Sequence, residues 1–169
     1  MLTKNFYSYM RAAFQKVSAT FIKTNGATGD SSWSTSAIPI FAAMNKWTWP
    51  NQVISNGVAF GTGATPATVS DYFLEGILGG TQIDVSVPSA VSFSRVDTYD
   101  EYSVTFGITN KTAEAITISE VGLFATVNPN TSVSNVLVDR TVLDTPVTIP
   151  AGQSKQITYT IRFNYGDAV

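Results

Sequence analysis

The chain has no cysteine and no histidine, and only 13% of its 169 residues are charged. Cysteine and histidine supply most activated nucleophiles, soft-metal ligands and proton shuttles at neutral pH. Without them the chain has no disulfides, no thiolate or Ser–His catalysis and no typical zinc site. We therefore expect a protein that is not an enzyme, uses no cofactor and acts through its surfaces.

Positive charge and long apolar runs are also scarce. Ten Lys and Arg residues stand against twelve Asp and Glu, which gives a net charge of −2 and a pI near 4.9. Counterion release by nucleic acid needs a basic stripe, so no nucleic-acid partner is expected. No apolar run approaches the roughly 18 residues of a membrane span, and the N-terminus lacks the apolar core of a signal peptide. We expect no membrane partner and synthesis in a cytoplasm.

Apolar and aromatic side chains are abundant. Hydrophobic residues make up 44% of the chain, and there are ten Phe, seven Tyr and three Trp. A chain of this length is most simply one domain with one core. A surface poor in Lys and Glu but rich in hydroxyls and amides is typical of a subunit held by permanent contacts. The composition favours assembly with copies of itself.

The C-terminal part of the chain predicts an antiparallel sheet. In the last apolar run, Ile157, Tyr159 and Ile161 alternate with Thr158 and Thr160, the period of a half-buried strand. Turn signals every 8–12 residues, roughly, favour a sandwich over βαβ units. The expected strands are 58–61, 82–87, 90–97, 101–109, 114–118, 121–127, 135–143, 145–149 and 154–165, and a brief helical segment is expected at 68–78.

The N-terminal part predicts an amphipathic helix over residues 3–17, with Thr3 as its N-cap. The apolar face of this helix consists of Leu2, Phe6, Met10 and Phe14. A β-prone run at 18–24 follows and ends at the turn signal Asn25-Gly26. Residues 27–36 are expected to form a loop.

These elements predict a mainly β fold, an antiparallel β-sandwich with an N-terminal amphipathic helix or arm. We expect a single domain over residues 1–169. Residues 1–56 would form the helix and arm, and residues 57–169 the sandwich.

Two groups of residues resemble known sites, and each has a structural alternative. Gly57, Gly61 and Gly63 suggest a phosphate loop but lack its GK[ST] ending, so tight backbone turning is favoured. Asp71 and Glu75, four residues apart on the expected helical segment, could form a paired-carboxylate site. Asp71 more simply stabilises the start of that segment.

The densest acidic cluster is Asp97, Asp100 and Glu101. Oxygen-rich loops of this kind bind Ca²⁺, but the spacing does not fit an EF-hand, and a solvated hairpin tip is favoured. Five aromatic side chains could be platforms on which sugar rings stack. The alternative is that they are buried in the core or in a subunit interface. These residues are Trp33, Trp47 and Trp49, with Tyr99 and Tyr102.

Glu120 lies where the apolar alternation changes phase. Ile118 belongs to one phase and Val121 to the other, which predicts a bulge near Ser119 and Glu120. If the bulge turns Glu120 inward, the carboxylate needs a partner, and Arg140 on the next strand is the leading candidate. The alternative is an exposed Glu120 at a strand edge.

Several segments together resemble small virion structural proteins of tailed bacteriophages: GVAFGTGATPATVSDYFLE, EVGLFA, LVDRTVLDTPVTIPAG and ITYTIRFNY. EVGLF is also similar to an EIGLF-type strand of phage tail-fibre and collar proteins. The resemblance implies a non-enzymatic virion component made in the bacterial host cytoplasm, with copies of itself and other virion proteins as partners.

The position of such a subunit in the particle has alternatives. The tail or neck side is slightly preferred, because of the EVGLF similarity. Capsid decoration or head-fibre anchoring comes next. A carbohydrate- or receptor-binding module would instead contact a host surface glycan.

Overall fold

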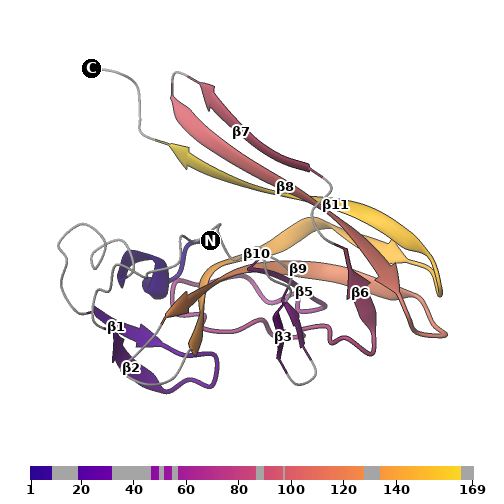
Figure 1. Cartoon of the computed structure of the whole chain (residues 1–169), viewed down its shortest axis with the longest axis horizontal. Helices are drawn as coiled ribbons and strands as arrows, with labels where there is room; N and C mark the ends of the chain where they lie inside the picture. The colour runs from indigo at the N-terminus through magenta and orange to yellow at the C-terminus, as the bar shows by residue number, and fades with distance from the viewer. Residues whose placement is uncertain are drawn as a thin grey trace.

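Two antiparallel sheets face one another across a shared apolar core (Figure 1). The computed structural model describes residues 1–8, 19–31, 47–49, 52–54, 57–86, 90–96, 98–127 and 134–164. The first sheet has the order β10-β9-β5, and these strands are Ser134–Ile149, Ile116–Val127 and Val58–Gly61. The second has the order β11-β8-β6, with β7 also paired to β8. Its strands are β6 Ile83–Val85, β7 Ala90–Val96, β8 Tyr99–Asn110 and β11 Ser154–Asn164. The predicted mainly β, antiparallel fold is confirmed.

The core lies between the sheets and follows the alternation of the sequence. On β11, Ile157, Tyr159 and Ile161 are buried, whereas Thr158 and Thr160 are exposed. Phe60 of β5 and Phe106 of β8 meet edge to face across the core, with ring centroids 5.8 Å apart. Each such ring stabilises the fold by about 1.5–3 kcal/mol relative to leaving it exposed.

Two expected strand boundaries inside the first sheet are wrong. Residues 114–118 and 121–127 belong to one strand, β9, and residues 135–143 and 145–149 belong to one strand, β10. Ile118 and Val121 both face the main core, so the predicted change of phase is present. The extra residues of the bulge lie in β10, however, and not in β9. Val142 pairs with Glu120 and Val147 with Ile118, so residues 143–146 lie opposite Ser119 alone. Pro146 lies in this stretch and has no N–H to donate to a ladder.

Segment 62–82 covers the other face of the first sheet and forms a second, smaller core. Leu74 is fully buried there against Phe124 and Leu137, with Ile77 partly buried beside them. A Cβ at Gly122 would lie 2.8 Å from Leu74 Cδ2, so only glycine lets this segment approach the sheet so closely. The described part of the segment is loop and turn, and the helical segment expected at 68–78 is wrong.

The N-terminus packs against β10 and does not begin as a helix. Leu2 forms a β-bridge with Asp139, and the N–H of Thr3 donates to the Val138 carbonyl at 3.0 Å. The Thr3 hydroxyl donates to the Leu137 carbonyl at 2.6 Å. Helix is described over residues 4–8, where Phe6 is buried in the main core. The rest of the expected helix, including Met10 and Phe14, lies outside the described residues.

Two short hairpins complete the described structure. Strands β1, Ala19–Ile22, and β2, Thr28–Ser31, are joined by the predicted Asn25-Gly26 turn, in which Gly26 has φ 81°. The loop expected at 27–36 is therefore wrong over Thr28–Ser31, because the turn aligns those residues with β1. Strands β3, Trp47–Trp49, and β4, Gln52–Ile54, form the other hairpin.

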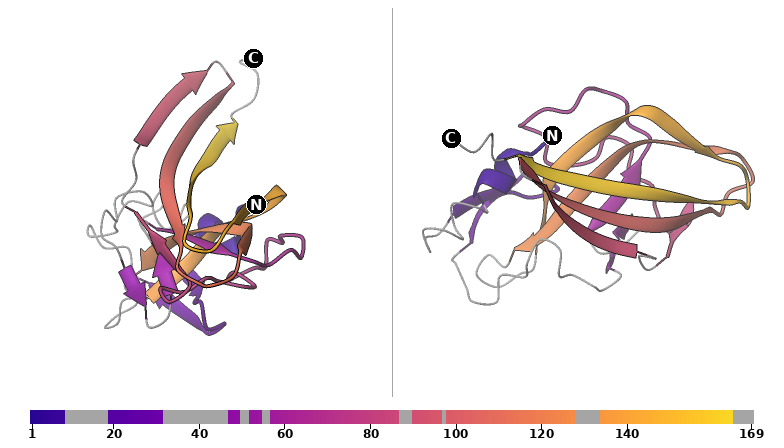
Figure 2. Two further views of the ribbon diagram at one scale, coloured as in Figure 1. Left: turned by 90° about the vertical axis from the view of Figure 1, so that its right-hand side faces the viewer. Right: turned by 90° about the horizontal axis from the view of Figure 1, so that it is seen from above.

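The second sheet extends beyond the core. Figures 1 and 2 show β7, the adjoining part of β8 and the end of β11 curving away from the rest of the molecule. In the part of the chain that the structure describes, no helix is long and apolar enough to cross a membrane.

Candidate functional site

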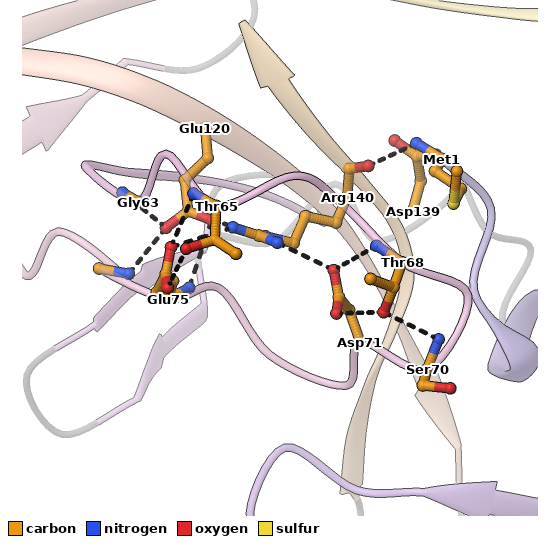
Figure 3. A network of polar contacts seen from close by, with 11 residues as sticks. Met1, Gly63, Thr65, Thr68, Ser70, Asp71, Glu75, Glu120, Asp139 and Arg140 are labelled. Carbon is orange, nitrogen blue, oxygen red and sulfur yellow. Dashed lines mark hydrogen bonds and ion pairs between the residues drawn. The ribbon is translucent and has the colours of Figure 1, made fainter.

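The main concentration of charge lies between β9, β10 and segment 62–82 (Figure 3). Glu120 of β9 and Arg140 of β10 both point toward that segment. Arg140 Nε lies 2.8 Å from Glu120 Oε2, and the two side chains are 4% and 0% exposed. The structure thus brings together the pair predicted from the sequence and places it in the interior.

Glu120 accepts three further hydrogen bonds, all from the backbone of segment 62–82. Its Oε1 accepts from the N–H of Gly63 at 3.1 Å and of Gly76 at 2.7 Å. Its Oε2 accepts from the N–H of Glu75 at 3.2 Å. A buried carboxylate is costly unless its oxygens are satisfied, and here four donors satisfy them. The carboxylate therefore fixes two points of this segment to the sheet, one at Gly63 and one at Glu75 and Gly76.

Arg140 binds two more carboxylates at the surface end of the same network. Its Nη1 lies 2.9 Å from Asp71 Oδ2 and its Nη2 3.5 Å from Glu75 Oε2. Burial disfavours the charged guanidinium, but the hydrogen bonds to Asp71 and Glu120 outweigh burial and raise the pKa of Arg140 above its usual value. One arginine thus remains a cation among three carboxylates.

Asp71 and Glu75 are held by the loop itself, which explains why no helix forms there. Asp71 accepts from the N–H and hydroxyl of Thr68 at 2.9 and 2.7 Å. Glu75 accepts from the N–H and hydroxyl of Thr65 at 3.1 and 2.6 Å. The N–H of Glu75 is bonded to Glu120 and so is not used in a helical ladder. The carboxylates favour local turns over helix.

The glycines of this region make room for the carboxylate. A Cβ at Gly63 would lie 2.6 Å from Glu120 Oε1, and one at Gly61 would lie 2.5 Å from the same oxygen. Of Gly57, Gly61 and Gly63, only Gly57 has a positive φ, 80°, which marks a residue needed for turning. The preference for backbone turning therefore holds for Gly57, whereas Gly61 and Gly63 are needed for close approach.

A second buried carboxylate links the two sheets. Asp139 of β10 accepts from the Tyr159 hydroxyl of β11 at 2.6 Å and from the Thr141 hydroxyl at 2.9 Å. The Met1 amino group lies 3.0 Å from its other oxygen. Burial and the neighbouring Asp139 charge raise the pKa of Tyr159 far above its usual value, so the phenol remains a donor. Asp139 and Tyr159 therefore act as a cross-sheet tie.

A surface hollow of about 490 Å³ opens beside the arginine network. Tyr72 lines it and is 42% exposed, with its ring 3.5 Å from the position of a Cβ on Gly26. Its other lining residues are mainly polar: Thr24, Asn25, Thr65, Thr68, Ser70, Asp71, Glu75 and Arg140. The two carboxylates in the hollow already accept two or more hydrogen bonds each. The hollow therefore offers a ligand hydroxyl, amide and aromatic groups rather than an unbonded carboxylate.

The predicted acidic cluster is divided by the pleat of β8. Asp100 binds Arg95 through two bonds of 2.8 and 3.0 Å, whereas Glu101 binds Arg162 at 2.5 Å. Adjacent strand residues point to opposite faces, so these carboxylates do not converge. Asp97 lies outside the described residues. Within the described ranges, no group of three or more carboxylates is placed to hold a metal ion.

The aromatic candidates are only partly described. Trp33 lies outside the described residues, while Trp47 and Trp49 are the first and last residues of β3. The guanidinium of Arg162 lies 4.9 Å from the centre of the Tyr99 ring. A cation covers one face of this ring, the arrangement of a cation–π contact.

Buried asparagines were missed by sequence reasoning, among them Asn5 and Asn110. Asn5 is 2% exposed; its Nδ2 donates to the carbonyls of Ile22 at 2.8 Å and Leu137 at 3.1 Å, and its Oδ1 accepts from the Ile22 N–H at 2.8 Å. Asn110 is fully buried at the end of β8, beside the turn after β10. A lone Asn in a sequence usually signals a turn, so no signal distinguished these two from the exposed ones.

Acid sensitivity follows from the carboxylates of the network. The Thr65 bonds hold the pKa of Glu75 below its ordinary 4.5; at Asp71, burial opposes ionisation but bonds from Thr68 and Arg140 outweigh it and hold the pKa below 3.8. A depressed folded pKa contributes stability that is present above the unfolded value and is lost as pH falls through the folded value. Urea midpoints should therefore decline as pH falls below about 4.5. Asp71→Asn with Glu75→Gln should flatten that decline; an unchanged pH profile in this variant would contradict the assignment.

Comparisons with known proteins leave the site to be interpreted from its own chemistry. No protein-family model matches the chain, and neither the curated proteins nor the solved structures give a match.

Proposed function

We propose that this chain is a non-enzymatic structural subunit of a tailed-bacteriophage virion, present in many copies. The observation that carries the non-enzymatic role is the state of its main charged cluster. Glu120 accepts four hydrogen bonds, and Asp71 and Glu75 are each held by a threonine and by Arg140. The pKa values of Asp71 and Glu75 lie below their ordinary values, and a carboxylate of low pKa is a weak general base.

The virion assignment is supported by the sequence resemblance, in particular by the segments EVGLFA and ITYTIRFNY. EVGLFA begins with the buried Glu120 and continues along β9, and ITYTIRFN lies within β11. Both segments are thus part of the sandwich framework. We propose the tail or neck side of the particle, with capsid decoration or head-fibre anchoring as the alternative position. The partners would be copies of itself and other virion proteins.

Protein analysis of purified particles tests this role. In particles from a phage that encodes this chain, peptides of the chain should remain at a constant ratio to the major capsid protein through repeated density-gradient purification. A matched non-virion protein of the same phage should be lost. Loss of this chain along with that control would contradict the proposed function.

A carbohydrate- or receptor-binding module is the second candidate, and the hollow around Tyr72 favours it. An exposed aromatic face beside hydroxyl, amide and carboxylate groups can stack on a pyranose ring and bond its hydroxyls. Glycan binding that Tyr72→Ala abolishes would support a contact with a host surface glycan. Glycan binding that survives in this variant would exclude the hollow as the glycan-binding site.

A further inference from the structure

We propose that the outer edge of β11 pairs with β11 of a second copy of this chain, antiparallel about a two-fold axis. This inference rests on the proposed role as an assembly subunit and names the surface used. β11 ends the order β11-β8-β6, and no described strand pairs with its other side. The edge therefore presents a row of backbone donors and acceptors that a further strand can bind.

The hydrogen bonds of β8 identify which residues of β11 face outward. The N–H of Ser86 donates to the Gly107 carbonyl, and the Gly107 N–H donates to the Ser86 hydroxyl, so the backbone of Gly107 points away from β11. Backbone groups alternate along a strand, so Phe106 points toward β11 and bonds its partner Ile157. By the same alternation, the backbone groups pointing out of the edge belong to Gln156, Thr158, Thr160 and Arg162.

This edge lacks the features by which sheets usually avoid association. Its eleven residues pair with β8 in unbroken register from Ser154 to Asn164 and include no proline or glycine. Bulges, prolines and outward lysines are the common protections of an edge strand. The two charges of β11 are Lys155, near the hairpin end, and Arg162, which is bound to Glu101.

A second copy is favoured because the strand is complementary to itself. If Tyr159 lies on the two-fold axis, Thr158 of one copy stands opposite Thr160 of the other, and Gln156 stands opposite Arg162. Hydroxyl–hydroxyl hydrogen bonds of this kind already join β11 to β8, where Thr158 bonds Thr105 and Thr160 bonds Ser103, both at 2.8 Å. The register also keeps the two Arg162 side chains apart. The pairing would join two four-stranded sheets into one.

Sedimentation over a range of concentrations tests this pairing in the full-length chain. The unmodified chain should form a dimer. Thr160→Pro should give a monomer, halving the measured mass with the β-sheet circular dichroism spectrum retained, because this N–H points outward and donates no bond to β8. Thr160→Lys should also weaken the dimer, and it keeps every backbone hydrogen bond. This variant therefore decides the result if the proline variant misfolds.

Val91→Pro is the matched control on the opposite edge of the same sheet. Val91 pairs with Val104, whose backbone points toward β11, so the N–H of Val91 also points out of the sheet. This variant should remain a dimer. A monomeric unmodified chain, a dimer that persists in both Thr160 variants, or a Val91→Pro monomer would overturn the proposal. A dimeric chain that is absent from particles would contradict the virion role alone.

Discussion

Arg140→Met should lower the free energy of unfolding by about 3–5 kcal/mol, the usual cost of removing one partner from a buried ion pair. The substitution leaves Glu120, with no exposed surface, without its cation. It also leaves Asp71 and Glu75 close to Glu120 with nothing to offset their repulsion. Urea denaturation at neutral pH measures the loss. A change below about 1 kcal/mol would be that of an exposed pair and would contradict the burial.

Glu120→Gln is the matched variant for the other side of the pair. The amide keeps the shape and retains one oxygen for the N–H groups of Gly63 and Gly76, but it loses the charge, and its NH2 group faces the donors Arg140 Nε and Glu75 N–H. Arg140 still binds Asp71 in this variant, so we expect a smaller loss than for Arg140→Met. Arg95→Met, which breaks the exposed pair with Asp100, should cost no more than about 1 kcal/mol.

Asn110→Ala should cost about 3 kcal/mol, because several buried or partly buried polar groups lose their partners together. Its Nδ2 donates to the carbonyls of Glu114 at 2.7 Å and Ile149 at 2.9 Å. Its Oδ1 accepts from the N–H and hydroxyl of Thr112 at 2.9 and 2.8 Å. Asn110→Asp should be at least as harmful, since a carboxylate would face two carbonyl oxygens.

Thermal and urea unfolding of both Asn110 variants provide the measurement. Asn25→Ala is the control, because the Asn25 side chain makes one bond of 3.0 Å to the Ala27 N–H on an exposed turn. We expect it to cost under about 1 kcal/mol. Equal effects at the two asparagines would show that burial does not distinguish them.

The antiparallel sheets could be predicted because their information is local. Period-two alternation and turn residues at the strand ends specify β8 and β11 within a few positions. The pairing of Glu120 with Arg140 could also be inferred, since a change of phase turns a charged residue inward and adjacent strands supply the partner. The other residues around this pair could not be predicted, because Gly63 and Asp71 reach it only through the path of the long loop, segment 62–82.

The errors have a common cause in tertiary contacts that compete with local preference. Residues 68–78 have helical spacing, but Glu120 binds the N–H groups of Glu75 and Gly76 that a helix would use. Leu2 has the spacing of a helix face, but its backbone pairs with Asp139 of β10. Asn5 binds the carbonyls of Ile22 and Leu137, and Asn110 binds that of Ile149. These carbonyls lie more than a dozen residues away along the chain, so no local window of sequence contains both partners.

A double-mutant cycle between Glu120 and Arg140 tests most directly the claim that this network is an internal structural tie. Urea unfolding of the unmodified chain, Glu120→Gln, Arg140→Met and the double variant gives the coupling energy of the pair. We predict a coupling of about 1–3 kcal/mol, with the double variant recovering part of the Arg140→Met loss. Recovery should be incomplete because Asp71 still lacks its cation. Additive effects, with coupling within about 0.5 kcal/mol of zero, would contradict the account.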